Sequence, residues 1–174
     1  LKKYLMMDKI VNNSNRLFNR YQRGGNTQKI CDTQCLNKIF GDFKAVAKTE
    51  VDLNDINNNT NVNATYGTIT PKGVEKLLNH LNIDNSDTFL DLGSGIGNVV
   101  VQFALNSNVQ KALGIEYVKS RYNQSINYVN EFRKEFANEF NNTQVEIQNK
   151  DINNFNINDS SIIFTCSTCF PTEL

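Results

Sequence analysis

The stretch DTFLDLGSGIGNVVVQFAL, at residues 87–105, decides the fold of this chain. An apolar run at 88–92 is joined to a second apolar run at 99–105 by a turn that contains three glycines. The first run has the length of a buried strand, and the second begins a helix. The sequence therefore predicts a strand, a glycine turn and a helix in succession.

Further strands and helices are predicted on both sides of this unit. Thr70 followed by Pro71 marks a helix start, because threonine is a good N-cap and proline suits the first helical position. Strands are expected at 112–117, 145–148 and 161–165, and an amphipathic helix at 119–140. Strands that alternate with helices predict an α/β fold with a parallel, Rossmann-like sheet.

The spacing of the glycines distinguishes between two kinds of ligand. Gly93, Gly95 and Gly97 form G-x-G-x-G after the acidic Asp91, whereas dinucleotide-binding turns have G-x-G-x-x-G and direct a helix N-terminus at a pyrophosphate. S-adenosylmethionine carries a sulfonium and an ammonium group but no phosphate, so a carboxylate beside the turn attracts it. The spacing therefore predicts S-adenosylmethionine as the cofactor.

Two further carboxylates fit this prediction. Glu116 closes the second strand about twenty residues beyond the glycines, where an acid can accept hydrogen bonds from both ribose hydroxyls. Asp151 follows the third strand, where it can meet the adenine amino group with Ile152 against the ring. An aspartate in a polar loop is also a common turn residue, so that alternative stays open for Asp151.

The rest of the chain suggests three parts. We expect a helical N-terminal region at 1–51, an Asn-rich linker at 52–64 and a partial methyltransferase domain at 65–174 from which the C-terminal strands are missing. Residues 1–50 carry ten Lys or Arg against four Asp or Glu. Such a segment suits a polyanion or an acidic protein surface, although a solvated helical face is the alternative.

Composition and the cysteines exclude some classes of protein. No apolar run has the length of a membrane span or signal peptide, so an intracellular protein is expected, with no membrane contact. Cys31 and Cys35 lie far along the chain from Cys166 and Cys169, and we expect reduced cysteines rather than a zinc or redox site. His80 is expected at the surface, and no metal site can be assembled.

The segment TYGTIT at 65–70, together with the glycine motif and GIEYV at 114–118, resembles the non-SET histone lysine methyltransferases of the disruptor-of-telomeric-silencing family. The resemblance implies that cofactor contacts come from the Tyr-Gly loop, the glycine turn and the two later acids. These residues are Tyr66, Thr68, Asp91, Gly93, Ser94, Gly95, Gly97, Asn98, Glu116, Asp151 and Ile152. Thr68 stands where the family has a glutamate, and Cys166 stands where it has an asparagine.

The resemblance also implies a function. We expect a histone or other protein lysine N-methyltransferase, a chromatin regulator of the nucleus that contacts histones or nucleosomes, with Tyr66, Thr168 and Phe170 as candidates for the wall of the acceptor channel. One alternative is a class I methyltransferase with a non-histone acceptor, which would suit the cytoplasm. Another is an S-adenosylmethionine-binding module without catalysis.

Overall fold

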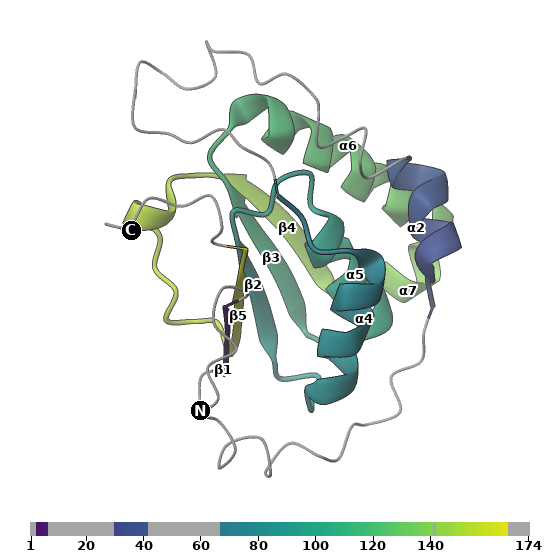
Figure 1. Cartoon of the computed structure of the whole chain (residues 1–174), viewed down its shortest axis with the longest axis horizontal. Coiled ribbons are helices and arrows are strands. Elements are labelled where there is room, and N and C mark those ends of the chain that lie inside the picture. Colours follow the sequence, from purple (N-terminus) through teal and green to yellow (C-terminus); the bar gives the residue numbers. More distant parts are fainter. Residues whose placement is uncertain (1–2, 7–29, 42–66, 141, 167–174) are drawn as a thin grey trace.

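The structure, a computed structural model, describes residues 3–6, 30–41, 67–140 and 142–166. Its centre is a parallel sheet of five strands in the order β1-β5-β2-β3-β4 (Figure 1). The strands are β1 (Lys3–Met6), β2 (Thr88–Leu92), β3 (Lys111–Glu116), β4 (Gln144–Asn149) and β5 (Ile162–Thr165). Counted from β2, the order 3-2-1-4 is that of a Rossmann-like sheet, which confirms the predicted fold class.

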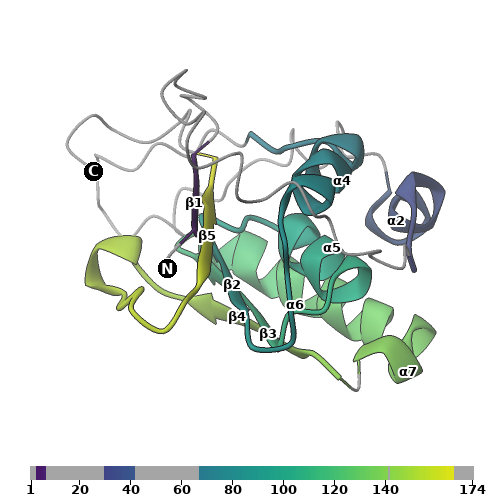
Figure 2. The same ribbon diagram turned by 90° about the horizontal axis from the view of Figure 1, so that it is seen from below.

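The helices of the described residues gather on one face of this sheet (Figures 1 and 2). They are α2 (Thr33–Phe40), α4 (Pro71–His80), α5 (Asn98–Asn106), α6 (Lys119–Glu135) and α7 (Ala137–Phe140). Every residue of α5 is buried, because this helix lies between the sheet and its neighbours. The other face carries a smaller apolar cluster, in which Ile152, Phe155 and Ile157 cover Leu90 and Ile115.

Local sequence explains where the central elements begin. Thr70 caps α4 by accepting a hydrogen bond from the N–H of Gly73 at 3.2 Å, and Pro71 follows at the first helical position. The three middle residues of strand β2, Phe89, Leu90 and Asp91, are buried, as expected for a short strand that is covered on both faces. His80 lies exposed at the end of α4, with Nδ1 2.6 Å from the carbonyl oxygen of Lys76, as expected for a surface histidine.

Three predictions about the helices and cysteines need correction. The N-terminal region is not all helical, because Lys3–Met6 pairs with β5 as a parallel strand. The helix predicted at 119–140 ends at Glu135, since Phe136 leaves helical geometry with φ −122° and ψ 47°. Cys31 and Cys35, expected to be reduced, form a disulfide with their Cα atoms 5.4 Å apart. The predicted linker at 52–64 lies outside the described residues.

Candidate functional site

The glycine turn lies at the carboxyl edge of the sheet, directly after β2. Gly93, Gly95 and Gly97 have φ angles of 81°, 56° and 82°, which side chains with a Cβ rarely adopt. The turn is held against β3, because the N–H groups of Gly93 and Ser94 both donate to the carbonyl of Ile115 at 2.9 Å. Gly97 then caps the start of α5. The predicted turn is therefore present, with Gly93 exposed at its start and Gly95 and Gly97 buried.

A fourth glycine, to which we assigned no role from the sequence, makes this packing possible. Gly114 lies on β3 directly beside Asp91 in the register of the sheet. A Cβ at this position would lie 2.7 Å from the Ser94 Oγ and 2.7 Å from the Ile147 Cδ1, closer than real contacts allow. Gly114 therefore lets the turn lie flat on the sheet.

The carboxylate of Glu116 supports the turn from the end of β3. Its Oε2 accepts a hydrogen bond from the N–H of Gly95 at 2.7 Å, and its Oε1 accepts one from Val118 at 2.8 Å. The residue is only 5% exposed, and burial raises the pKa of the carboxyl despite these hydrogen bonds. The N–H of Tyr117 also favours the ionised form, and since a carboxylate has about four acceptor positions, these donors do not use all of them.

Asp91 and Ser94 each have a buried polar atom at this edge that makes no hydrogen bond among the described residues, as does Gln148 on β4. Asp91 is 2% exposed, and its Oδ1 and the Ser94 Oγ are buried with no hydrogen-bond partner among the described residues. Burial raises the pKa of Asp91 to about 8, and the nearby charge of Glu116 adds to the shift. Such a group is costly to leave unpaired, and a cation beside it would offset that cost.

Thr68 and Asn98 lie at the helix side of the turn and contact each other. The Asn98 Nδ2 donates to the Thr68 Oγ1 at 3.0 Å, and the Thr68 hydroxyl lies 3.3 Å from the Asn98 Oδ1. Asn98 is fully buried, and its carbonyl accepts a hydrogen bond from the Gln102 Nε2 at 3.1 Å. The contact fastens the loop before α4 to the first turn of α5.

Asp151 and Ile152 lie at the same edge, after β4, and both are half-buried. Asp151 caps a short helical turn, η2 (Ile152–Asn154), by accepting a hydrogen bond from the N–H of Asn153 at 2.9 Å. The candidates for the wall of the acceptor channel, Tyr66, Thr168 and Phe170, lie outside the described residues. Cys166 is half-buried directly after β5.

A residue that sequence reasoning missed connects two of these elements. Asn149, the last residue of β4, donates from its Nδ2 to the carbonyl oxygens of Glu116 and Tyr117, both at 2.8 Å. The amide therefore fixes the end of β3, from which the Glu116 side chain projects. In the sequence, the only sign of a role for Asn149 is that it lies two residues before Asp151, and such a spacing is too common to be informative.

The arrangement as a whole suits a particular kind of ligand. The glycine turn lies where the order of strands reverses between β2 and β5, which is where open α/β sheets bind ligands. Buried acids flank the turn, and no group of three His, Cys, Asp or Glu side chains among the described residues could hold a metal. No helix of this part of the chain is long and apolar enough to span a membrane. A cationic ligand with a hydroxyl pair fits best.

The chain is similar to several known proteins. The family model "Histone methylation protein DOT1" matches residues 43–171. Relatives named "Histone-lysine N-methyltransferase, H3 lysine-79 specific" include one from Caenorhabditis elegans, 30% identical over 116 residues, and one from Drosophila melanogaster, 41% identical over 51 residues. These matches cover 63% and 29% of the chain, but only 12% and 3% of the relatives.

A third relative and a solved structure are more distant. The Dictyostelium discoideum protein of the same name is 29% identical over 115 residues, which cover 63% of the chain and 6% of that protein. The structure is that of an RNA methyltransferase from Salinibacter ruber in complex with S-adenosyl-L-homocysteine. It is 23% identical with a TM-score of 0.47, and the match covers 57% of this chain and 60% of that one. A likeness at this level does not indicate a substrate.

Proposed function

The chain belongs to the DOT1 histone methylation protein family, and from that premise we propose that it binds S-adenosylmethionine and methylates a lysine of a histone. One observation carries the proposal. Two buried acids, Asp91 and Glu116, flank a turn of three glycines with positive φ, and Asp91 has a carboxylate oxygen without a partner among the described residues. That combination suits a ligand that is cationic at one end and carries a ribose.

Each part of the cofactor has a suitable group at this edge. In the proposal the Asp91 carboxylate holds the ammonium end, and Glu116 accepts hydrogen bonds from the ribose hydroxyls through its unused acceptor positions. Asp151 and Ile152 hold the adenine. The glycines Gly93, Gly95 and Gly97 allow the turn its backbone angles, and the exposed Gly93 lets the ligand approach the backbone without meeting a Cβ.

The chemistry of the transfer needs little from the protein beyond alignment. When bound, S-adenosylmethionine supplies an electrophilic methyl group on its sulfonium. The residues of the chain orient donor and acceptor and exclude water, and such alignment can contribute roughly 7–11 kcal/mol of the barrier. Tyr66, Thr168 and Phe170 are proposed to form an apolar channel, which would keep the acceptor amine neutral by disfavouring its charged form.

A histone lysine is the proposed acceptor because the family is named for histone methylation and the three relatives are named as histone-lysine N-methyltransferases. The excess of basic residues at 1–50 adds to this, since a nucleosome presents DNA as a polyanion. With a histone as acceptor, the proposed site of action is chromatin, in the nucleus.

A labelling experiment tests this function. The purified chain is incubated with radiolabelled S-adenosylmethionine and nucleosomes, free histones, RNA or small-molecule acceptors. We expect label on a histone in the wild type and none in Glu116→Gln. Glu146→Gln is the matched control, because Glu146 lies on the next strand in an ion pair with Lys111 at 2.8 Å, away from the glycine turn. Label on RNA or small molecules alone would contradict the proposal.

A second candidate, a module that binds S-adenosylmethionine without turnover, is favoured by Thr68. A neutral hydroxyl that contacts Asn98 stands where the family has a glutamate for the methionine end. Calorimetric binding of the cofactor without label on any acceptor would support this candidate. If Thr68→Glu then gave turnover, the missing carboxylate would be the reason that the wild-type chain has none.

A further inference from the structure

The first turn of α2 contains the Cys31–Cys35 disulfide. Asp32 lies between the two cysteines as the N-cap of the helix, and its Oδ1 accepts a hydrogen bond from the N–H of Cys35 at 3.0 Å. The disulfide therefore links the residue before the cap to the first turn after it. It fixes how the chain enters the helix.

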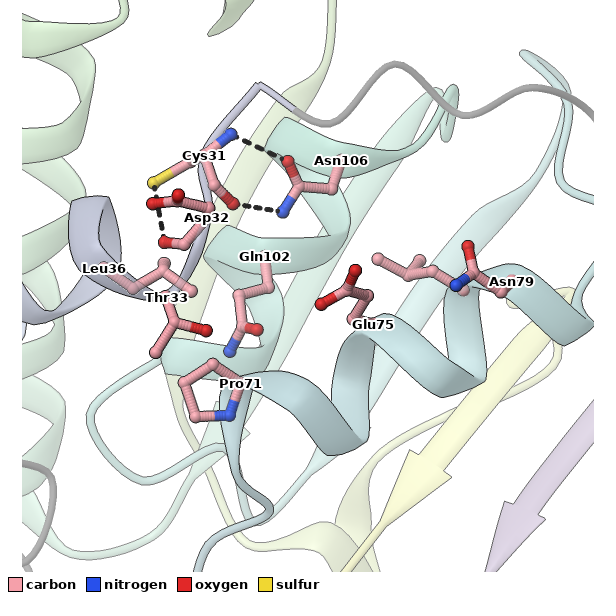
Figure 3. A pocket seen from close by; sticks show the side chains of 10 residues that line it. Cys31, Asp32, Thr33, Leu36, Pro71, Glu75, Asn79, Gln102 and Asn106 are labelled. Atoms are coloured by element: carbon pink, nitrogen blue, oxygen red, sulfur yellow. Dashed lines mark hydrogen bonds between the residues drawn. The ribbon is translucent and has the colours of Figure 1, made fainter.

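This entry point is docked on α5 through one side chain (Figure 3). The Asn106 Oδ1 accepts hydrogen bonds from the N–H groups of Ile30 and Cys31, both at 3.0 Å, and its Nδ2 donates to the Cys31 carbonyl at 2.9 Å. Cys31 is 1% exposed as a result. Three hydrogen bonds to a single buried amide hold the start of α2 against the last turn of α5.

The first turn of α2 is not closely packed against α4. A cavity of about 50 Å³ lies between α2, α4 and α5, and Figure 3 shows Thr33, Glu75 and Gln102 around it. A void gives its lining few contacts to hold it in place. The other end of α2 is anchored by Phe40, whose ring centroid lies 5.0 Å from that of Phe132 on α6. In the first turn the buried Leu36 packs into the core, whereas the disulfide and Asn106 hold the residues that lead into the helix.

We propose that Cys31–Cys35 is a reversible redox site that exchanges with a low-molecular-weight thiol and disulfide couple and thereby controls the docking of the first turn of α2 on α5. The oxidised pair holds Cys31 in register with Asn106. Reduction loosens the contact of residues 30–35 with α5, while the buried Leu36 and Phe40 keep the rest of the helix attached.

The difference in burial of the two sulfurs sets the direction of the exchange. Cys35 is half-buried, whereas Cys31 is buried, so an incoming thiolate reaches the Cys35 Sγ. A bond forms between that Sγ and the thiolate sulfur, and the bond to Cys31 breaks to leave the Cys31 thiolate, which takes up a proton. A second thiol releases Cys35 as a thiol. Two electrons pass to the protein, and the two small thiols leave as one disulfide.

A titration with reduced and oxidised glutathione tests the proposal on the whole chain. Cys166→Ser and Cys169→Ser are introduced so that only the α2 pair can react. Differential alkylation and mass spectrometry count the free thiols, and hydrogen exchange follows the amides of 33–40. We expect a reversible two-electron transition, with exchange in the first turn at least roughly tenfold faster after reduction, given the closed loop of about five residues.

A variant locked in the reduced state provides the control. Cys31→Ser with Cys35→Ser should show the fast exchange at every glutathione ratio. The proposal is overturned if the two thiols stay free under oxidising conditions, or if exchange at 33–40 is the same in both redox states. It does not depend on cofactor binding, which the experiment does not measure.

Discussion

Two buried aspartates, Asp87 and Asp91, mark the two ends of β2, and their surroundings differ. Asp87, before the strand, accepts hydrogen bonds from the Ser161 hydroxyl at 2.7 Å and from the N–H of Asp84 at 3.1 Å. Asp91, four residues later, has a buried Oδ1 without a partner among the described residues. The aspartate at the amino edge of the sheet has hydrogen-bond partners within the protein, whereas the aspartate at the carboxyl edge has an oxygen that makes no hydrogen bond among the described residues.

The difference shows how a structural acid can be told from a ligand-binding one. A buried carboxylate with protein partners stabilises the fold, and one without partners costs free energy in the empty protein. Such a cost is tolerated where a ligand supplies the missing partner. Because the two residues are of the same type and lie near opposite ends of one strand, each is a control for the other.

The largest expected effect is on the pH dependence of stability. Because the pKa of Asp91 is raised to about 8, its contribution to stability is fully present below the unfolded value near 4 and is lost as pH rises through 8. The free energy of unfolding should fall by up to roughly 5 kcal/mol across that window. Urea unfolding from pH 5 to pH 9 measures it. Asp91→Asn should flatten the curve, and an unchanged curve would show that Asp91 is not a buried carboxyl.

The next effect is on ligand affinity. Asp91→Asn should weaken the binding of S-adenosylmethionine by roughly 10- to 100-fold, because a hydrogen bond to a charged group contributes about 1.5–3 kcal/mol. Isothermal titration calorimetry measures it, with Asp87→Asn as the matched control that keeps the wild-type affinity. Equal losses in both variants would remove the distinction between the two ends of β2.

The third effect is on stability at the amino edge. Asp87→Asn should lower the free energy of unfolding by about 1–2 kcal/mol, because Ser161 and the N–H of Asp84 donate to different carboxylate oxygens and asparagine keeps only one of them. Chemical denaturation at pH 7 measures the change. Asp91→Asn, in contrast, should raise stability at the same pH. A stabilised Asp87→Asn protein would contradict the assignment of that edge to structure.

The smallest effect concerns Asn149. Asn149→Ala should weaken S-adenosylmethionine binding by about three- to tenfold, because the end of β3 loses the two contacts that fix Glu116. In a Glu116→Gln background the same change should cost nothing further, since coupled residues are not additive. A full additional loss in that background would mean that Asn149 acts independently of Glu116.

Local patterns were enough to predict the centre of the molecule. The bounds of β2, Thr88–Leu92, follow from an apolar run that ends at a glycine turn, and Glu116 follows from its place at the end of the next strand. These features depend on neighbours in sequence. The roles of the predicted site residues stay predictions. Three of these residues, Tyr66, Thr168 and Phe170, lie outside the described part of the chain.

The features that were missed depend on contacts distant in sequence. Gly114 matters because Ser94 lies over it, and Asn149 matters because of carbonyls on another strand. The Cys31–Cys35 pair is held by Asn106, about 75 residues away. Strand β1 pairs with β5 from the far end of the chain. No periodicity in the sequence marks such contacts.

Proton release on binding tests the central claim, that the unpartnered Asp91 is the anchor of a cationic ligand, most directly. At pH 7 a carboxyl with a pKa of about 8 is mostly protonated, and it must ionise to hold an ammonium group. Calorimetry with S-adenosylmethionine in buffers of different ionisation enthalpy should show the release of nearly one proton in the wild type and Asp87→Asn, and none in Asp91→Asn. Binding with no proton release in the wild type, or equal release in Asp91→Asn, would contradict the claim.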